Sequence, residues 1–235
     1  MTVPDLPAEP PAATVLIVDD QDIVATSLTY ILRGNGFNAH RVPVIDLDTV
    51  RATAARYEPG VVLLDLDLGP APDGGTLDGV ELIAPLCAHG WTILVVTGTD
   101  DLDRIAAAVA HGASNWVMKS ADFQKLVNAA IDAANGQHTM PAGERAALVA
   151  RHRNNEAGRQ LLAARLRLLT RREKAVLDAL ASGLTPAAMA AESHNSTATI
   201  RNQIHSILTK LEVNSQVEAI AIAHRHLRPM PASRA

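Results

Sequence analysis

Five polar side chains lie at the carboxyl ends of short apolar runs in this chain. The runs cover residues 14–18, 60–64, 91–96 and 113–118, and the polar residues beside their ends are Asp19, Asp20, Asp65, Thr97 and Lys119. Short runs rich in β-branched residues are typical of strands that are buried on both faces of a parallel sheet. Ligands of such sheets bind outside the carboxyl ends of the strands. We therefore expect these side chains to share one pocket.

Each of these residue types contributes a different chemistry. The carboxylates of Asp19 and Asp20 would offer oxygen ligands to a hard cation, with Mg²⁺ the usual choice beside a phosphate. The carboxylate of Asp65 can attack phosphorus and form an acyl phosphate when nearby positive charge offsets the phosphoryl oxygens. Thr97 would donate a hydroxyl to a phosphoryl oxygen, and Lys119 would supply an ammonium.

A single aspartate after a strand is more often a helix cap or a solvated turn residue, and a single lysine usually lies on the surface. The prediction of a phosphorylation site therefore depends on the order of the whole set rather than on one member.

The elements that must position these residues alternate regularly along the chain. Helical patterns cover residues 22–33, 46–57, 80–88, 101–110 and 122–135, and residues 37–42 supply a further strand. Alternating strands and helices with right-handed crossovers place helices on both faces of a parallel sheet. The sequence thus predicts an α/β, doubly wound, five-stranded parallel sheet of the flavodoxin-like class.

With this order of residues, the segment 14–136 resembles the receiver domain of two-component response regulators. The resemblance implies that Asp19 and Asp20 bind Mg²⁺ and that Asp65 accepts a phosphoryl group from a sensor histidine kinase while also facing the metal. It further implies that the backbone carbonyl of Asp67 is a metal ligand.

The resemblance also assigns the remaining residues of the pocket. Thr97 and Lys119 would contact the phosphoryl group, and Thr97 would act in switching together with Trp116, which stands where the family usually has Tyr or Phe. Tryptophan is bulkier, so an inward rotation would need more room. The stretch 69–78 is several residues longer than the corresponding loop of the family, and its glycines and prolines predict a surface loop.

Charge divides the chain into two parts. Residues 1–143 contain 7 Lys and Arg against 18 Asp and Glu, whereas residues 144–235 contain 14 against 7. An acidic half that binds metal and a basic half suggest that the second part meets a polyanion, most simply DNA, although a basic face without a partner is the alternative. The single Cys87 excludes an internal disulfide. No apolar span approaches the length of a membrane helix, so we expect a cytoplasmic protein without a membrane partner.

The second part is marked by signals for helix starts. A long helical stretch over residues 144–169 indicates a linker helix, which we assign to residues 137–167. Capping boxes are predicted at Thr170–Glu173 and Ser215–Glu218, and Thr185 and Ser196 can cap two further helices. Residues 186–192 and 197–211 have the proportions of a helix-turn-helix within a small all-α, four-helix domain. Residues 1–13 and 228–235 are expected to be disordered.

Residues 168–227 resemble the DNA-binding domain of the LuxR/NarL family. The segments that carry the likeness are 169–173, 183–185, 196–202 and 207–211. The domain departs from the family in Gln203, where histidine is common, and in Ser193 and Asn195, where apolar residues usually lie. The resemblance implies that the last helix forms a dimer interface.

The helix over residues 197–211 would lie in the major groove. Its position predicts that Arg201, Asn202 and His205 contact base edges, because arginine can read guanine and asparagine adenine. Thr199 and Lys210 are expected to contact phosphates. We expect three apolar residues of the same helix to face the core: Ile200, Ile204 and Leu208.

The two parts together predict a phosphorylation-controlled transcriptional regulator rather than an enzyme. A histidine kinase would phosphorylate Asp65, and phosphorylation would control homodimerisation and binding of double-stranded promoter DNA. One alternative is a regulator that works independently of phosphorylation. Another is a phosphatase that resembles the haloacid dehalogenases, although those enzymes place their acidic pair after the lysine, whereas Asp19 and Asp20 come first here.

Overall fold

The computed structural model describes residues 13–137 and 140–226, and the chain divides into two compact units, residues 1–154 and 155–235. The predictions for the chain ends, residues 1–13 and 228–235, fall outside the described residues apart from Ala13. We describe each unit by itself.

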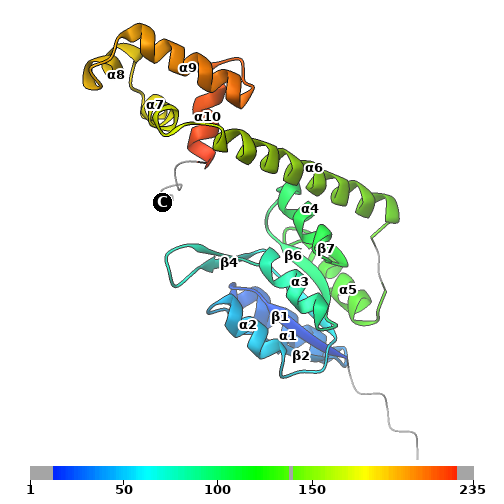
Figure 1. The fold of residues 1–235 in the computed structure, drawn as a ribbon. Helices are drawn as coiled ribbons and strands as arrows, with labels where there is room; N and C mark the ends of the chain where they lie inside the picture. The colour runs from blue at the N-terminus through cyan, green and yellow to red at the C-terminus, as the bar shows by residue number, and fades with distance from the viewer. Residues whose placement is uncertain (1–12, 138–139, 227–235) are drawn as a thin grey trace, which may run out of the picture. The chain divides into compact units, whose positions relative to one another are not determined.

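The first unit is built on a five-stranded parallel sheet (Figure 1). Its order is β2-β1-β3-β6-β7, and the strands are β1 (Thr14–Val18), β2 (Asn38–Arg41), β3 (Val61–Leu64), β6 (Thr92–Thr97) and β7 (Asn115–Met118). The side chains of β1 and β3 alternate between two buried clusters on opposite faces of the sheet, which explains why both strands read as continuous apolar runs.

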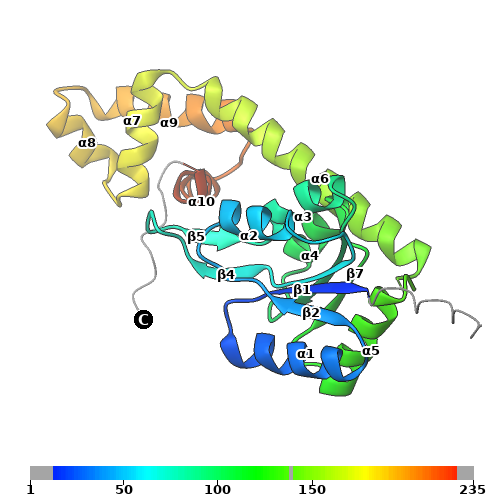
Figure 2. The same ribbon diagram turned by 90° about the horizontal axis from the view of Figure 1, so that it is seen from below.

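Helices cover both faces of this sheet. Figure 2 shows α1 (Asp22–Gly34) and α5 (Phe123–Ala134) on one face. The opposite face carries α2 (Leu47–Ala54), α3 (Val80–Ala88) and α4 (Leu102–Ala110). The predicted flavodoxin-like architecture is confirmed, with element ends within a few residues of those expected.

The stretch after β3 differs from the prediction of a surface loop. Strands β4 (Asp67–Pro70) and β5 (Thr76–Asp78) form an antiparallel hairpin, which projects from the sheet in Figure 1. Leu68 and Leu77 are buried in one of the core clusters, so the hairpin is held by apolar packing. The glycines and prolines marked a turn, but they gave no sign that the residues beside the turn pair with each other.

The long helix α6 (Ala142–Arg167) begins in the first unit, where its opening turns pack against α4. Leu148 is buried together with Ile105 and Val109 of α4. Arg145 donates to the backbone carbonyl of Ala113 at 2.9 Å and also to that of Ser114. This part of the helix is therefore an integral element of the first unit.

The second unit contains the end of α6 and four further helices: α7 (Arg171–Ala181), α8 (Pro186–Glu192), α9 (Thr197–Leu211) and α10 (Gln216–His226). The side chains of Thr170, Thr185 and Ser196 cap α7, α8 and α9 as predicted. Its core is formed by buried apolar side chains of α7, α8, α9 and α10, and Leu166 of α6 is partly buried against them.

The two predicted capping boxes have different outcomes. Thr170 and Glu173 form the complete reciprocal pair. At the start of α10 the hydroxyl of Ser215 accepts from the Glu218 N–H at 3.2 Å, but the Glu218 carboxylate accepts from the N–H of Asn214 instead of that of Ser215. The second capping box is therefore only half formed.

Among the described residues, no helix combines the length and apolar character needed to cross a membrane.

Candidate phosphorylation site and nucleic-acid interface

The sheet brings the predicted polar residues to one edge. Asp19 directly follows β1, Asp65 follows β3, Thr97 ends β6 and Lys119 follows β7. Two backbone hydrogen bonds fix these strand ends: the Asp65 N–H donates to the Val18 carbonyl at 2.9 Å, and the Lys119 N–H donates to the Thr97 carbonyl at 2.7 Å. Parallel pairing thus places residues from distant parts of the chain side by side.

A buried charge cluster lies at the centre of this edge. The Lys119 ammonium is 2.6 Å from Oδ2 of Asp65 and 2.7 Å from Oδ2 of Asp19. The Asp65 and Asp19 side chains are 2% and 3% exposed, and that of Lys119 is 10% exposed. One ammonium cannot neutralise two carboxylates, so the cluster keeps an excess of negative charge. Because burying an unpaired charge is costly, this excess favours the binding of a further cation.

The pKa directions follow from this arrangement. Burial raises the pKa of Asp65 above its ordinary value, and the nearby Asp19 carboxylate adds to the rise, although Lys119 and the Asp67 N–H oppose it. Burial by itself would lower the pKa of Lys119, but its hydrogen bonds and ion pairs with Asp19 and Asp65 outweigh burial and raise it. Lys119 is therefore a cation, and the raised pKa of Asp65 reflects a burial that its hydrogen bonds only partly compensate.

The carboxylates of this edge fit a divalent cation. Asp19, Asp20 and Asp65 each offer one carboxylate oxygen, and the three oxygens all lie within 4.8 Å of one another. Asp20 is exposed while the other two are buried, so a cation could enter from solvent and keep water ligands. A set of oxygen ligands with a net negative charge suits Mg²⁺.

The two residues assigned to switching lie on adjacent strands. Thr97 is fully buried, and its hydroxyl oxygen accepts from the Thr99 N–H at 3.2 Å. Trp116 on β7 is partly buried and packs against both the core cluster beside α3 and the smaller cluster beneath α6. Their roles in switching stay predictions.

Arg104 is a residue of this site that sequence reasoning missed. It lies on α4, and its guanidinium donates to the Leu66 carbonyl at 2.9 Å, to Oδ1 of Asp78 at 3.0 Å and to the carboxylate of Asp67. These acceptors belong to the segment after Asp65 and to the hairpin. A single arginine in a helix carries no pattern that could have revealed this role.

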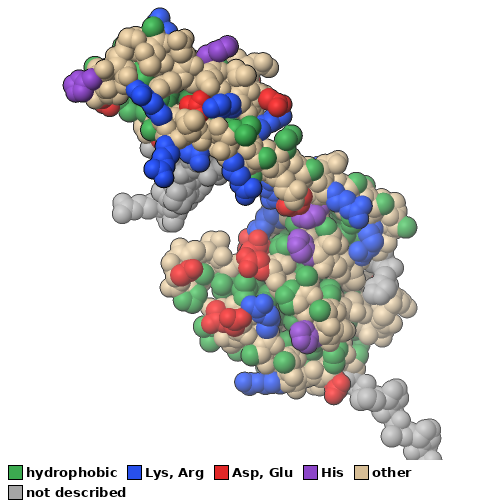
Figure 3. Space-filling model, in the orientation of Figure 1, with side chains coloured by type: hydrophobic (Ala, Val, Ile, Leu, Met, Phe, Trp, Pro, Cys, Tyr) green, Lys and Arg blue, Asp and Glu red, His purple; other side chains and the backbone are tan. Residues whose placement is uncertain are grey.

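The predicted base-contacting residues share one face of α9. Arg201, Asn202 and His205 are exposed, while Ile200 and Ile204 are buried and Leu208 is partly buried against the core. Thr199 is close to the start of the helix, where its hydroxyl bonds to that of Ser196 at 2.8 Å. The face drawn in Figure 3 shows Lys and Arg side chains gathered over the helical unit.

Lys210, the second predicted phosphate contact, is 31% exposed and pairs with a buried carboxylate. Its ammonium is 2.8 and 2.6 Å from the two oxygens of Glu173 on α7. The same carboxylate accepts from the Ser206 hydroxyl at 2.7 Å and from the Thr170 N–H at 2.7 Å. Burial by itself would raise the pKa of Glu173, but these hydrogen bonds, that of Lys210 first, lower it to about 2.

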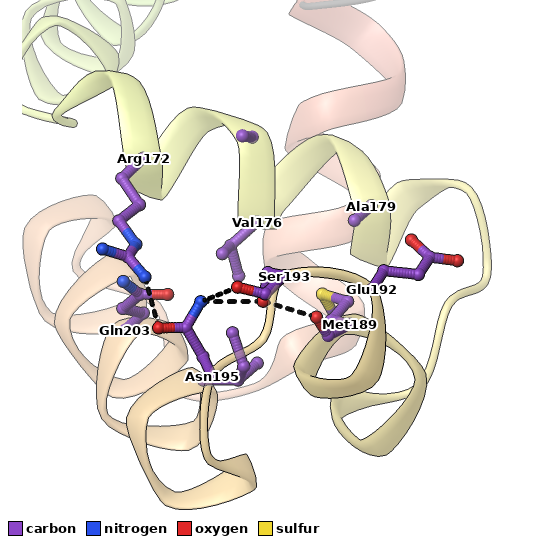
Figure 4. Close-up of a pocket in the computed structure, with 10 residues that line it drawn as sticks. Arg172, Val176, Ala179, Met189, Glu192, Ser193, Asn195 and Gln203 are labelled. Carbon is purple, nitrogen blue, oxygen red and sulfur yellow. Dashed lines mark hydrogen bonds between the residues drawn. The ribbon is translucent and has the colours of Figure 1, made fainter.

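The three departures from the family pattern line a cavity of about 330 Å³ between α7, α8 and α9 (Figure 4). Arg172 donates to the Asn195 side chain at 2.6 Å, and Asn195 donates to the carbonyl and hydroxyl of Ser193 at 2.8 and 2.9 Å. Ser193 and Asn195 therefore satisfy each other across the turn of the helix-turn-helix. Gln203 lies beside them, and its side-chain oxygen is buried.

Comparisons with known proteins agree with this organisation. A family model described as response regulator receiver domain matches residues 15–131, and one described as bacterial regulatory proteins, luxR family, matches residues 167–223. The transcriptional regulatory protein LiaR of Bacillus subtilis is 25% identical over 90% of this chain and 97% of its own length. The DNA-binding transcriptional activator DevR/DosR of Mycobacterium tuberculosis is 27% identical over 92% of this chain and 96% of its own.

Among solved structures, full-length FixJ from B. japonicum is 27% identical to this chain, covers 91% of it and 96% of itself, and superposes with a TM-score of 0.43. The two family matches occupy the sheet unit and the helical unit, in that order along this chain. The chain therefore belongs to the response regulators of the NarL/LuxR type, with a receiver domain followed by a LuxR-family domain.

Proposed function

We propose that this chain is a transcriptional regulator controlled by transfer of a phosphoryl group from a sensor histidine kinase to Asp65. The observation that carries the proposal is the buried Asp65 carboxylate, paired with Lys119 at 2.6 Å beside two further carboxylates. This is a nucleophile with a cation beside it and an adjacent set of metal ligands. The homologous regulators and the two matched domains support the same function.

The phosphoryl transfer follows from the groups around Asp65. One carboxylate oxygen of Asp65 forms a bond to phosphorus while the bond from phosphorus to the donor histidine nitrogen breaks, and the imidazole leaves with the electron pair of that bond. Mg²⁺ held by Asp19, Asp20, Asp65 and the Asp67 carbonyl would offset the charge of the phosphoryl oxygens. Lys119 would move its hydrogen bond to a phosphoryl oxygen.

Thr97 would couple the phosphorylation of Asp65 to a conformational change. Its hydroxyl is buried at the end of β6, and reorienting it toward a phosphoryl oxygen would change the space next to Trp116 on the neighbouring strand. Trp116 packs against the core cluster beside α3 and against the cluster that contains Leu148 of α6. A change in its position would therefore affect the packing of the start of α6. We assign the switch to this pair of residues.

The second unit would bind double-stranded promoter DNA through α9. Arg201, Asn202 and His205 would contact base edges, and Thr199 and Lys210 would contact phosphates. An ammonium has three donors, so Lys210 can hold the Glu173 carboxylate and still approach a phosphate. We propose that phosphorylation favours a homodimer, since one DNA site read by two copies binds more tightly.

Intact-mass measurement after incubation with a small-molecule phosphodonor and Mg²⁺ tests the phosphorylation step. We expect one phosphoryl adduct on the wild-type chain and none on Asp65→Asn. The matched control is Asp48→Asn, because Asp48 is an exposed aspartate of α2 that pairs with Arg51 and is not one of the pocket carboxylates. An adduct on Asp65→Asn would show that another residue is the acceptor.

Selection of duplexes from a random library, followed by titrations over a range of salt, tests the DNA-binding step. We expect Arg201→Ala to relax base preference at one position, at a cost of about 1–3 kcal/mol for the preferred base. Lys210→Gln should weaken binding to all sequences and reduce the salt slope. Equal enrichment of all sequences by the phosphorylated wild type would contradict the proposed regulator.

A further inference from the structure

The β4–β5 hairpin forms one side of the phosphorylation pocket. A Cβ on Gly69 would lie 3.0 Å from Oδ2 of Asp20, and a Cβ on Gly79 would lie 2.1 Å from the Asp65 carbonyl oxygen. At the second position the neighbour is backbone, so a larger residue would displace the segment that carries Asp65. The base of the hairpin is thus packed directly against the carboxylate of Asp20 and the backbone of Asp65.

The pairing within the hairpin orients the backbone of Asp67 toward the pocket. Asp67 pairs with Asp78, and the Gly79 N–H donates to the Leu66 carbonyl at 2.9 Å. This bond makes Asp67 and Asp78 a non-hydrogen-bonded pair, in which the N–H and carbonyl of Asp67 face away from β5. The Asp67 N–H accordingly donates to Oδ1 of Asp65 at 3.2 Å.

Arg104 connects this segment to α4. It donates to the Leu66 carbonyl at 2.9 Å, directly before Asp67, and it bonds to the side chains of Asp67 and Asp78 on both hairpin strands. Its side chain is 29% exposed, whereas those of Asp67 and Asp78 are 61% and 42% exposed. Ion pairs with that much exposure add little stability, so the arrangement is better explained by the geometry that it imposes.

We propose that Arg104 is a positioning residue for the metal ligand of the phosphorylation site, because it fixes the segment Leu66–Asp67 and thereby aims the Asp67 carbonyl into the pocket. The inference rests on the proposed function, since it concerns the same site. Partners that orient metal ligands typically contribute 10–100-fold to metal affinity. The guanidinium is suited to this role because its planar fork can hold a carbonyl and two carboxylates at once.

Metal affinity of the full-length chain tests the proposal without any phosphoryl transfer. The dissociation constant of Mn²⁺ is measured from the electron paramagnetic resonance signal of the free ion, with Mg²⁺ as competitor. We expect Arg104→Gln to weaken binding about ten-fold. Arg104→Lys should retain only part of the affinity, because an ammonium cannot form the same set of bonds. The matched control is Arg51→Gln, which removes the arginine of an exposed ion pair on α2.

The sign of the effect separates positioning from simple electrostatics. If Arg104 acted only through its positive charge, its removal would strengthen cation binding. Unchanged or tighter Mn²⁺ binding by Arg104→Gln would therefore overturn the proposal, as would weakening of equal size in Arg51→Gln.

A second variant guards against a general defect in folding. Asp78→Asn keeps the arginine and its bond to the Leu66 carbonyl but replaces the ion pair with Asp78 by a neutral hydrogen bond, so we expect a smaller loss of affinity than in Arg104→Gln. Fluorescence-detected urea unfolding without metal should give both variants the wild-type midpoint. If both shift that midpoint and their affinities fall in proportion to the shift, Arg104 has only a structural role and the proposal fails. Absence of a phosphoryl adduct on the wild type would instead overturn the proposed function.

Discussion

The receiver and the helical unit each contain a buried carboxylate paired with a lysine, yet the pKa values of the two carboxylates are shifted in opposite directions. The pKa of Asp65 is raised, whereas the pKa of Glu173 is lowered to about 2. Lys119 and Lys210 lie at almost the same distance from their partners, 2.6 Å in both cases. The distance to the lysine therefore does not explain the difference.

The difference lies in how far hydrogen bonds compensate the burial of each carboxylate. Glu173 receives four, from Lys210 to both oxygens, from the Ser206 hydroxyl and from the Thr170 N–H. Asp65 receives one from Lys119 and one, at 3.2 Å, from the Asp67 N–H, and it shares its lysine with Asp19. A fully satisfied carboxylate stabilises helix packing, while an incompletely satisfied one is free to bind a cation or attack phosphorus.

The largest effect on stability should come from breaking the satisfied cluster. Glu173→Ala removes the partner of Lys210 and the reciprocal cap, so we expect the helical unit to lose about 2.5–4 kcal/mol, from about 1.5–3 for the charged hydrogen bonds and about 1 for the cap. Hydrogen exchange of peptides from α7 and α9 in the full-length chain measures this loss. The control is Glu192→Ala, an exposed glutamate of α8, which should change stability by no more than about 0.5 kcal/mol.

Acid should remove the stability that the Glu173 carboxylate contributes to the helical unit. The folded-state pKa of Glu173 is below its ordinary value of 4.5, so the stability that it contributes is complete above pH 4.5 and is lost as the pH falls toward about 2. The difference in exchange protection between wild type and Glu173→Gln should therefore shrink over that window. A difference that stays constant between pH 4.5 and 2.5 would contradict the assigned pKa.

Magnesium should stabilise the receiver but not the helical unit. An ion that binds only the folded state adds about 2.7 kcal/mol when its concentration is 100 times the dissociation constant. Both tryptophans, Trp91 and Trp116, belong to the receiver, so urea unfolding followed by fluorescence reports that domain alone. Exchange of α7 and α9 peptides in the same samples provides the internal control. Equal stabilisation of both units would indicate a nonspecific salt effect.

Part of each cluster could be predicted from the sequence. Asp19, Asp65, Thr97 and Lys119 each end or follow an apolar run, and parallel pairing alone brings strand ends together, so their meeting was predictable. The capping box of Thr170 and Glu173 was predictable because both members lie within one turn of a helix.

The contacts that were missed join residues far apart in the chain without a repeating pattern. Arg104 meets Asp67 and Asp78 only because the stretch after β3 pairs as a hairpin, and its composition indicated no more than a turn. Lys210 was assigned to DNA from its place on α9, but its bond to Glu173 depends on how α7 crosses that helix. Local signals predict elements and their ends, whereas side-chain partners across elements require the packing itself.

The smallest effect should come from the hydroxyl that caps α7. Thr170→Ala removes the side-chain oxygen that accepts from the Glu173 N–H at 3.2 Å, and loss of such a cap costs about 1 kcal/mol. Lys210, Ser206 and the Thr170 N–H still donate to the Glu173 carboxylate in this variant. We therefore expect Thr170→Ala to lose nearly as much stability in acid as the wild type does. Thr170→Ser restores the hydroxyl and should restore the exchange protection of α7. If Thr170→Ala instead destabilised the helical unit as much as Glu173→Ala, the cap and the buried ion pair would form one cooperative network, and the low pKa of Glu173 would depend on the whole of it.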